Sequence, residues 1–213
     1  MKYEIRYKPA FAALFVTLDP GEHLVIAARS LVSCDPGLTV TTAWAGGWFT
    51  ALARYLCGRD SLYVNGVANQ RELPQQLVLA SAQLGDLEGL ELRAAARLCL
   101  EPQAYLASTA RIRLTMRWAG LKSWLAGSGL VRLQVQGRGL VFFGGHGHLS
   151  RQRVQDSLMV QAGHLVAHEP QLQCRVQFPQ GLRARAQTVN QLQGNGLVYL
   201  QSGSRQDLGR KGH

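Results

Sequence analysis

The chain has 213 residues, of which 46% are hydrophobic and 17% charged, and its 23 Lys and Arg against 13 Asp and Glu give a net charge of +10. This length suits one sizeable domain, and the hydrophobic content excludes a disordered chain. No apolar run approaches the roughly 18 to 20 residues of a membrane helix, and the first residues lack the apolar region of a signal peptide. Four scattered cysteines without a C-x-x-C pair favour reduced thiols. We therefore expect a cytoplasmic protein.

Alternation of apolar and polar residues dominates the chain and predicts antiparallel strands. Turn sequences rich in Gly and Pro separate the apolar runs, beginning with Asp19–Gly21 and Asp35–Gly37. Helical periodicity is weak outside Trp48–Leu56. The clearest strands are predicted at Ile112–Trp118, Val131–Gln136 and Cys174–Phe178. The polar end, residues 203–213, is predicted to be a flexible tail.

Comparing the sequence with itself indicates three internal copies of one β-unit. Trp44-Ala45-Gly46 matches Trp118-Ala119-Gly120 at an offset of 74 residues, and Phe178 takes the tryptophan position 60 residues further on. The repeats are predicted at about 22–65, 96–143 and 156–202, within a single β domain over 1–202. We expect the three aromatic residues to form one core layer contributed three times.

Several segments are similar to a widespread prokaryotic family. They are Met1–Ile5, Pro9–Phe11, Leu18–Glu22, Gly58–Asn65, Gly163–Ala167 and Gly196–Gln201. The family's eukaryotic branch is named altered inheritance of mitochondria protein twenty-four. The resemblance covers nearly the whole chain and implies an all-β fold, a TRAP-like (tryptophan RNA-binding attenuator protein-like) double-stranded β-helix or β-sandwich with three pseudo-repeats. The resemblance implies a function that is largely unassigned in bacteria, whereas the mitochondrial biogenesis branch resembles an inner-membrane organising factor and not an enzyme. No catalytic residues come with the family, and we expect no cofactor.

The positive charge is concentrated in the second half of the chain. Residues 1–101 carry 10 acidic and 9 basic residues, whereas residues 102–213 carry 3 acidic and 14 basic residues. In the two predicted strands of the second repeat, the cationic residues alternate with core residues, which predicts one arginine-rich sheet face. The candidate anion-binding residues are Arg111, Arg113, Arg117, Arg132 and Arg138. Guanidinium groups in such a row bind phosphates of nucleic acid or of anionic lipids, or they are only solvated.

Two segments combine bulky aromatic residues with glycine and a cation, each following a Trp-Ala-Gly sequence. Trp48, Phe49, Tyr55 and Trp124 are the candidate residues for a subunit interface or a membrane contact. Apolar loops that cap the ends of a β core have the same composition. Exposed sheet edges need covering, so we also expect a homo-oligomer.

The sequence offers little for catalysis. His146 and His148 are the only candidate metal ligands in an H-x-H spacing, and the arginines that follow them disfavour a cation. No G-x-S-x-G or phosphate-binding loop motif is present. The sequence thus favours a non-catalytic scaffold or binding module, acting on other proteins or at an anionic membrane surface. The alternative is an RNA- or nucleotide-binding protein that uses the arginine face, and a cupin-like metal enzyme ranks third.

Overall fold

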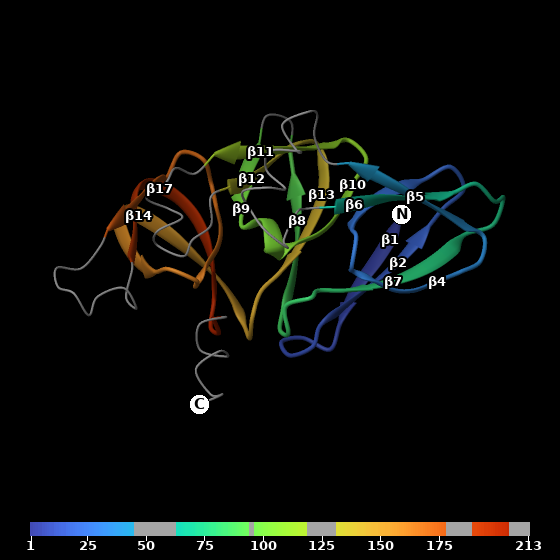
Figure 1. Ribbon diagram of the computed structural model, residues 1–213, viewed down its shortest axis with the longest axis horizontal. Coiled ribbons are helices and arrows are strands. Elements are labelled where there is room, and N and C mark those ends of the chain that lie inside the picture. The colour runs from blue at the N-terminus through green and yellow to red at the C-terminus, as the bar shows by residue number, and fades with distance from the viewer. Residues whose placement is uncertain (45–62, 94–95, 119–130, 178–188, 205–213) are drawn as a thin grey trace.

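Strands form where the sequence alternates between buried and exposed positions. In β2, Ala13–Leu18, the side chains of Leu14, Val16 and Leu18 are buried and the residues between them are partly exposed. The computed structural model describes residues 1–44, 63–93, 96–118, 131–177 and 189–204 (Figure 1). Within them, strands account for nearly all regular structure, so the prediction of an all-β fold is confirmed.

The described elements follow one another along the chain. They are β1 (Lys2–Arg6), β2, β3 (His23–Ala27), β4 (Leu31–Cys34), β5 (Leu38–Trp44), β6 (Tyr63–Asn69), β7 (Gln75–Ala80), β8 (Leu87–Leu92), β9 (Arg97–Leu100), the 3-10 turn η1 (Pro102–Ala104), β10 (Tyr105–Thr109), β11 (Ile112–Trp118), β12 (Val131–Gly137), β13 (Gly139–Gly144), β14 (Leu149–Gln161), β15 (Leu165–His168), β16 (Gln173–Gln177) and β17 (Val189–Gln201).

These strands build three sheets, and at the N-terminal end of the molecule β5 and β6 of the second sheet lie over the first sheet (Figure 1). The first sheet has the order β1-β2-β7-β4, and the second has the order β5-β6-β3-β10-β13-β8. The third has the order β11-β12-β9-β15-β17-β14, with β16 paired to β17 outside this path. All ladders between these strands are antiparallel, as the alternating sequence predicts.

The pairing shows three successive strand groups, which are β2–β7, β8–β13 and β14–β17. In each group a hairpin pairs with one further strand: β5–β6 with β3, β11–β12 with β9, and β16–β17 with the second half of β14. The remaining three strands of each group also pair: β2–β7–β4, β8–β13–β10 and the first half of β14 with β17 and β15. Neighbouring groups are joined where β10 pairs with β3 and where β15 pairs with β9.

The hydrophobic core is divided in the same way. One cluster of buried residues lies mainly in the first group and includes Leu14 and Leu79, and Phe142 joins it from β13 of the second group. A second cluster lies around Leu100, Leu133 and Phe143, and a third, smaller one contains Leu192 and Val198. None of the described helical residues forms a helix long and apolar enough to cross a membrane.

Trp44 is the last residue of β5 and pairs with Tyr63 of β6. Trp118 is the last residue of β11 and pairs with Val131 of β12. Their side chains and all of Phe178 lie outside the described part of the structure. The shared aromatic core layer therefore stays a prediction.

Candidate functional site

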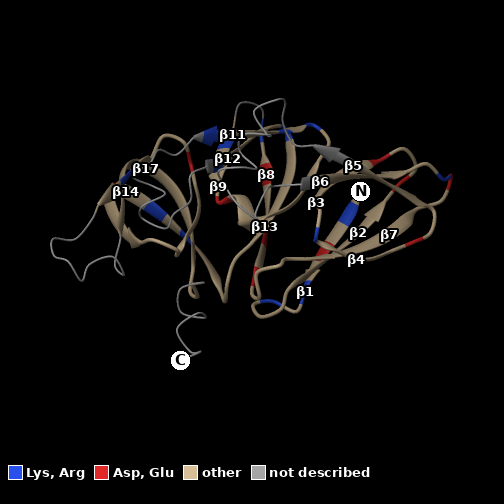
Figure 2. Ribbon diagram, in the orientation of Figure 1, with Lys and Arg blue, Asp and Glu red and all other residues tan. Residues whose placement is uncertain are grey.

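The arginine-rich segment lies on the hairpin of β11 and β12 at the upper edge of the molecule in Figure 2. The two strands pair in one sheet, with Arg113 opposite Gln136 and Arg117 opposite Arg132. Ile112, Leu133 and Val135 point into the core from the same two strands. Strand alternation thus places the cationic and amide side chains together on the opposite face of the hairpin.

One half of this face is a hydrogen-bonded cluster in which Gln134 and most of the Arg132 side chain are buried. The Arg132 guanidinium donates to the carboxylate of Glu101, and Arg117 donates to the side-chain oxygen of Gln134. Only 13% of the Arg132 side chain is exposed, and burial lowers the pKa of its guanidinium. The sequences of β11 and β12 contain no acidic residue, but Glu101, 31 positions away from Arg132 in the chain, supplies one. Arg132 is therefore already paired with a carboxylate and is not free to bind an anion.

Burial also governs the neighbouring titratable groups. It lowers the pKa of His168, whose ring Nδ1 donates a hydrogen bond to the Glu169 carbonyl, and it raises the pKa of Cys99 and of Cys174. A thiol with a raised pKa is mostly protonated near neutral pH and is a poor nucleophile. These cysteines behave as small apolar residues.

The other half of the face is an open pocket with a volume of about 250 Å³. Three arginines from three places in the fold surround it: Arg97 on β9, Arg111 in the turn before β11, and Arg113 on β11. Gln136 lies between Arg97 and Arg113 in the sheet, because it faces both of them across the ladders. No carboxylate belongs to the described lining of this pocket, so its electrostatic potential favours anions.

A glycine fixes the shape of the pocket. Gly137 ends β12 with φ +132°, a backbone conformation that L side chains rarely adopt. A Cβ atom at this position would lie 2.4 Å from the backbone oxygen of Arg111. The absence of a side chain thus lets the Arg111 turn lie directly against the end of β12.

The sequence-predicted anion-binding residues therefore divide among three environments. Arg111 and Arg113 line the pocket, whereas Arg117 and Arg132 belong to the hydrogen-bonded cluster. Arg138 is exposed beyond the end of β12 and does not line the pocket. Sequence reasoning missed Arg97, although the alternation of Arg97-Leu98-Cys99-Leu100 is the same signal that identified β11.

The two histidines considered as metal ligands face different surroundings. Gly147, between them, has φ +69° and breaks the regular strand that would direct both side chains the same way. His146 is buried, and its backbone N–H donates to Gln201. His148 is exposed, with its Nδ1 3.3 Å from the carboxylate of Asp86. Among the described residues, no three His, Cys, Asp or Glu side chains are close enough to hold a metal.

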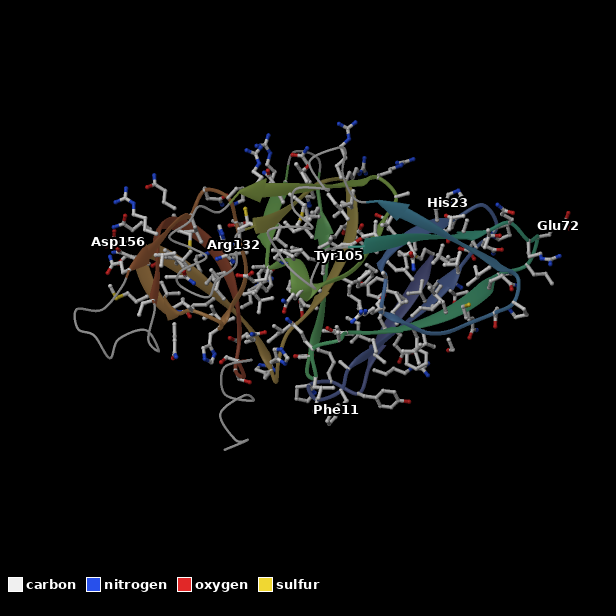
Figure 3. All side chains as sticks on the ribbon, in the orientation of Figure 1. Phe11, His23, Glu72, Tyr105, Arg132 and Asp156 are labelled. Atoms are coloured by element: carbon white, nitrogen blue, oxygen red, sulfur yellow. The ribbon has the colours of Figure 1, made fainter. Side chains whose placement is uncertain are left out.

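The aromatic residues proposed for an interface, Trp48, Phe49, Tyr55 and Trp124, lie outside the described residues. A different pair of exposed aromatic residues is seen instead. Tyr7 and Phe11 are 66% and 70% exposed, in the loop between β1 and β2. Phe11 lies at the lower edge of the molecule (Figure 3), whereas β11 lies at the upper edge (Figure 1).

Comparison with solved structures shows the same fold in a protein from Streptococcus pyogenes. Its crystal structure matches with a TM-score of 0.80 and 19% sequence identity, over 99% of this chain and 97% of that chain. At this identity the match shows the fold alone. No curated protein is similar enough to count as a relative of the chain. The assignment to a TRAP-like β-helix stays a prediction.

The family described as mitochondrial biogenesis AIM24 matches residues 3–203, which is nearly the whole chain and agrees with the resemblance carried by its N-terminal, central and C-terminal segments. The chain belongs to the mitochondrial biogenesis AIM24 family.

Proposed function

We propose that the protein is a non-catalytic binding module that holds phosphate groups of anionic lipids in the pocket lined by Arg97, Arg111 and Arg113. The observation that supports this most directly is the convergence of three guanidinium groups from three elements on one open pocket without a carboxylate in its described lining. Guanidinium groups donate paired hydrogen bonds to phosphate oxygens and remain charged at any physiological pH.

The chemistry of the pocket favours a phosphate group over a nucleobase. The described lining consists of Ala96, Gly137, Gln136 and the three arginines, and it includes no aromatic ring on which a base could stack. Its open shape suits a headgroup presented by a surface. Arg132 and Arg117, in contrast, already have partners and contribute no free donor row that could follow an RNA backbone.

The proposal is tested by sedimentation with vesicles made of equal parts of phosphatidylserine and phosphatidylcholine, compared with vesicles of phosphatidylcholine alone. We expect binding to the anionic vesicles only, with a steep decrease as salt is added. The triple substitution Arg97→Gln, Arg111→Gln and Arg113→Gln should remove most of this binding, because each cation near a membrane surface contributes about 1 kcal/mol. Free inorganic phosphate and a single-stranded RNA are tested in parallel.

The matched control removes the same amount of charge elsewhere. Arg151, Arg153 and Arg175 are exposed on β14 and β16, and their triple substitution by glutamine should leave vesicle binding nearly unchanged. An equal loss of binding in both triple variants would show that only net charge matters and would overturn the proposed site. Binding to RNA but not to vesicles would overturn the lipid assignment.

A further inference from the structure

Two sheet edges at opposite ends of the molecule carry no paired strand within the described residues. One is the outer edge of β4, which pairs only with β7, and the other is the outer edge of residues 158–161 in β14, which pair only with β17. Figure 1 shows β4 and β14 at the two ends of the long axis. One chain therefore cannot pair these two edges with each other.

Inside the chain, the equivalent edges are paired. At the first junction, β10 of the second strand group adds to β3 of the first, with Ala107 opposite Ile26 and Ser108 opposite Val25. At the second junction, β15 adds to β9 in the same manner, with Ala167 opposite Leu100. Each junction extends one sheet across two groups. Among the described strands, the first group thus leaves the outer edge of β4 unpaired, and the third leaves the outer edge of the second half of β14 unpaired.

The three strands β4, β10 and β15 share a local irregularity that fixes which residues correspond. β4, β10 and β15 pair with β7, β13 and β17, respectively, and each of them has one residue that is skipped in this ladder. The skipped residues are Val32 in β4, Leu106 in β10 and Val166 in β15. Leu106 and Val166 are 1% and 2% exposed, because each enters the core cluster of the preceding strand group. Val32 is 64% exposed.

The edges of β3, β9 and the second half of β14 differ in the same way, because a residue that is partly covered in β3 and β9 is exposed in β14. One position on these edges corresponds in the three groups, and it is occupied by Val25, Cys99 and Met159. In the first group, Val25 lies opposite Gly66, which in turn lies opposite Thr41. The corresponding rows are Cys99, Gln134 and Thr115 in the second group and Met159, Gln191 and Arg175 in the third. Val25 and Cys99 are partly covered by the strand at the junction, whereas Met159 is 61% exposed. Exposed apolar residues on unpaired strands are a signal for strand addition.

We propose that copies of this chain associate head to tail, with β4 of one copy adding to the second half of β14 in the next. The internal junctions give the register: Ser33 lies opposite Val160, and Cys34 lies opposite Met159. The combined sheet has the order β16-β17-β14-β4-β7-β2-β1, in which β4, β7, β2 and β1 come from the second copy. Val32 then packs against the third core cluster of the neighbouring copy, in the same way that Leu106 and Val166 pack in the first and second core clusters. This inference is independent of the lipid-binding proposal.

Cross-linking tests the register directly, because Cys34 is an exposed free thiol. In a chain with Cys57→Ser, the substitution Met159→Cys places a second thiol opposite Cys34 of the neighbouring copy, within disulfide reach. Mild oxidation should produce a ladder of covalent dimers, trimers and larger species on a non-reducing gel. Adding Cys34→Ser should abolish the ladder, and Gln155→Cys in place of Met159→Cys should give none.

A mixing experiment distinguishes this head-to-tail arrangement from any symmetric dimer. Val32→Lys blocks only the β4 edge, and Met159→Lys blocks only the β14 edge, since a lysine on an edge strand opposes pairing. Each variant alone should be a monomer of 23.3 kDa by light scattering, and an equimolar mixture should form a dimer. Leu84→Lys, at a residue that is 63% exposed elsewhere, should associate like the unaltered chain.

Three outcomes would overturn the proposal. The unaltered chain could remain monomeric up to millimolar concentration, the mixed variants could remain monomeric, or cross-linking could persist after Cys34→Ser through the introduced thiols alone. Circular dichroism of each variant confirms that its strands are intact, which is expected because both substituted residues are exposed.

Discussion

At the scale of single residues, Asn190 is the clearest departure from an apolar core. It is 1% exposed, and neither polar atom of its side chain has a hydrogen-bond partner within the described part of the chain. Its neighbours across the two ladders are Val160 and Val176. Leu133 holds the same position in the hairpin of the second group and is fully buried. An apolar side chain therefore fits this place in the fold.

We predict that Asn190→Leu raises the free energy of unfolding by about 1 kcal/mol or more, because it removes a buried polar group that forms no hydrogen bond with any described residue. Urea denaturation followed by circular dichroism measures the change. Asn69→Leu is the matched control, since Asn69 is equally buried but donates to the Leu18 and Leu73 carbonyls and accepts from the Arg71 N–H. The control should lose stability, and a loss in both variants would contradict the prediction.

At the scale of elements, the end of β12 depends on close backbone packing against the turn before β11. Gly137→Ala should lower the free energy of unfolding by about 2 kcal/mol, because the new Cβ meets the Arg111 carbonyl and the positive φ disfavours any side chain. The midpoint of urea denaturation reports this loss. Gly21→Ala separates the two causes, since Gly21 has φ +78° but open space around it. It should cost about 1 kcal/mol, and equal costs at both positions would exclude the packing explanation.

Sequence patterns were sufficient for the individual strands but not for their environment. The alternation in Ile112–Trp118 coincides with β11, and that of Val131–Gln136 lies within β12. Alternation predicts which side chains share one face of a strand. Whether that face is exposed to solvent depends on residues far away in the sequence. Glu101 reaches Arg132 from outside the hairpin, and Arg97 joins the pocket from a third strand. The pocket could therefore be located only once β9 was seen to pair with β12.

At the scale of the whole molecule, the offsets of 74 and 60 residues noted in the sequence also separate Leu31, Tyr105 and Leu165, which begin the three irregular ladders. The order of strands within each sheet could not be read from those offsets, because β10 and β15 pair both within their own group and with a strand of the preceding group. Pairing between groups leaves no local mark in the sequence.

The junctions lead to a prediction about stability that compares one substitution at two corresponding places. Val166→Ala should lower the free energy of unfolding by about 2 kcal/mol, since Val166 is buried at the second junction. Val32→Ala should change it by less than about 0.5 kcal/mol in dilute protein, where Val32 stays exposed. Urea denaturation at low protein concentration measures both. Similar losses at the two positions would contradict the correspondence.

The same junctions bear on how the chain folds during its synthesis. The edge of β3 stays unpaired until β10 has been synthesised, and the edge of β9 stays unpaired until β15 has been synthesised. The part of the chain that has left the ribosome therefore exposes a strand edge that only a later segment can cover. During synthesis, β10 pairs with β3 before β15 pairs with β9. Each pairing covers a strand edge that could otherwise pair wrongly with another nascent chain. Ribosome-bound chains halted just before β10 should therefore be the ones most prone to aggregate.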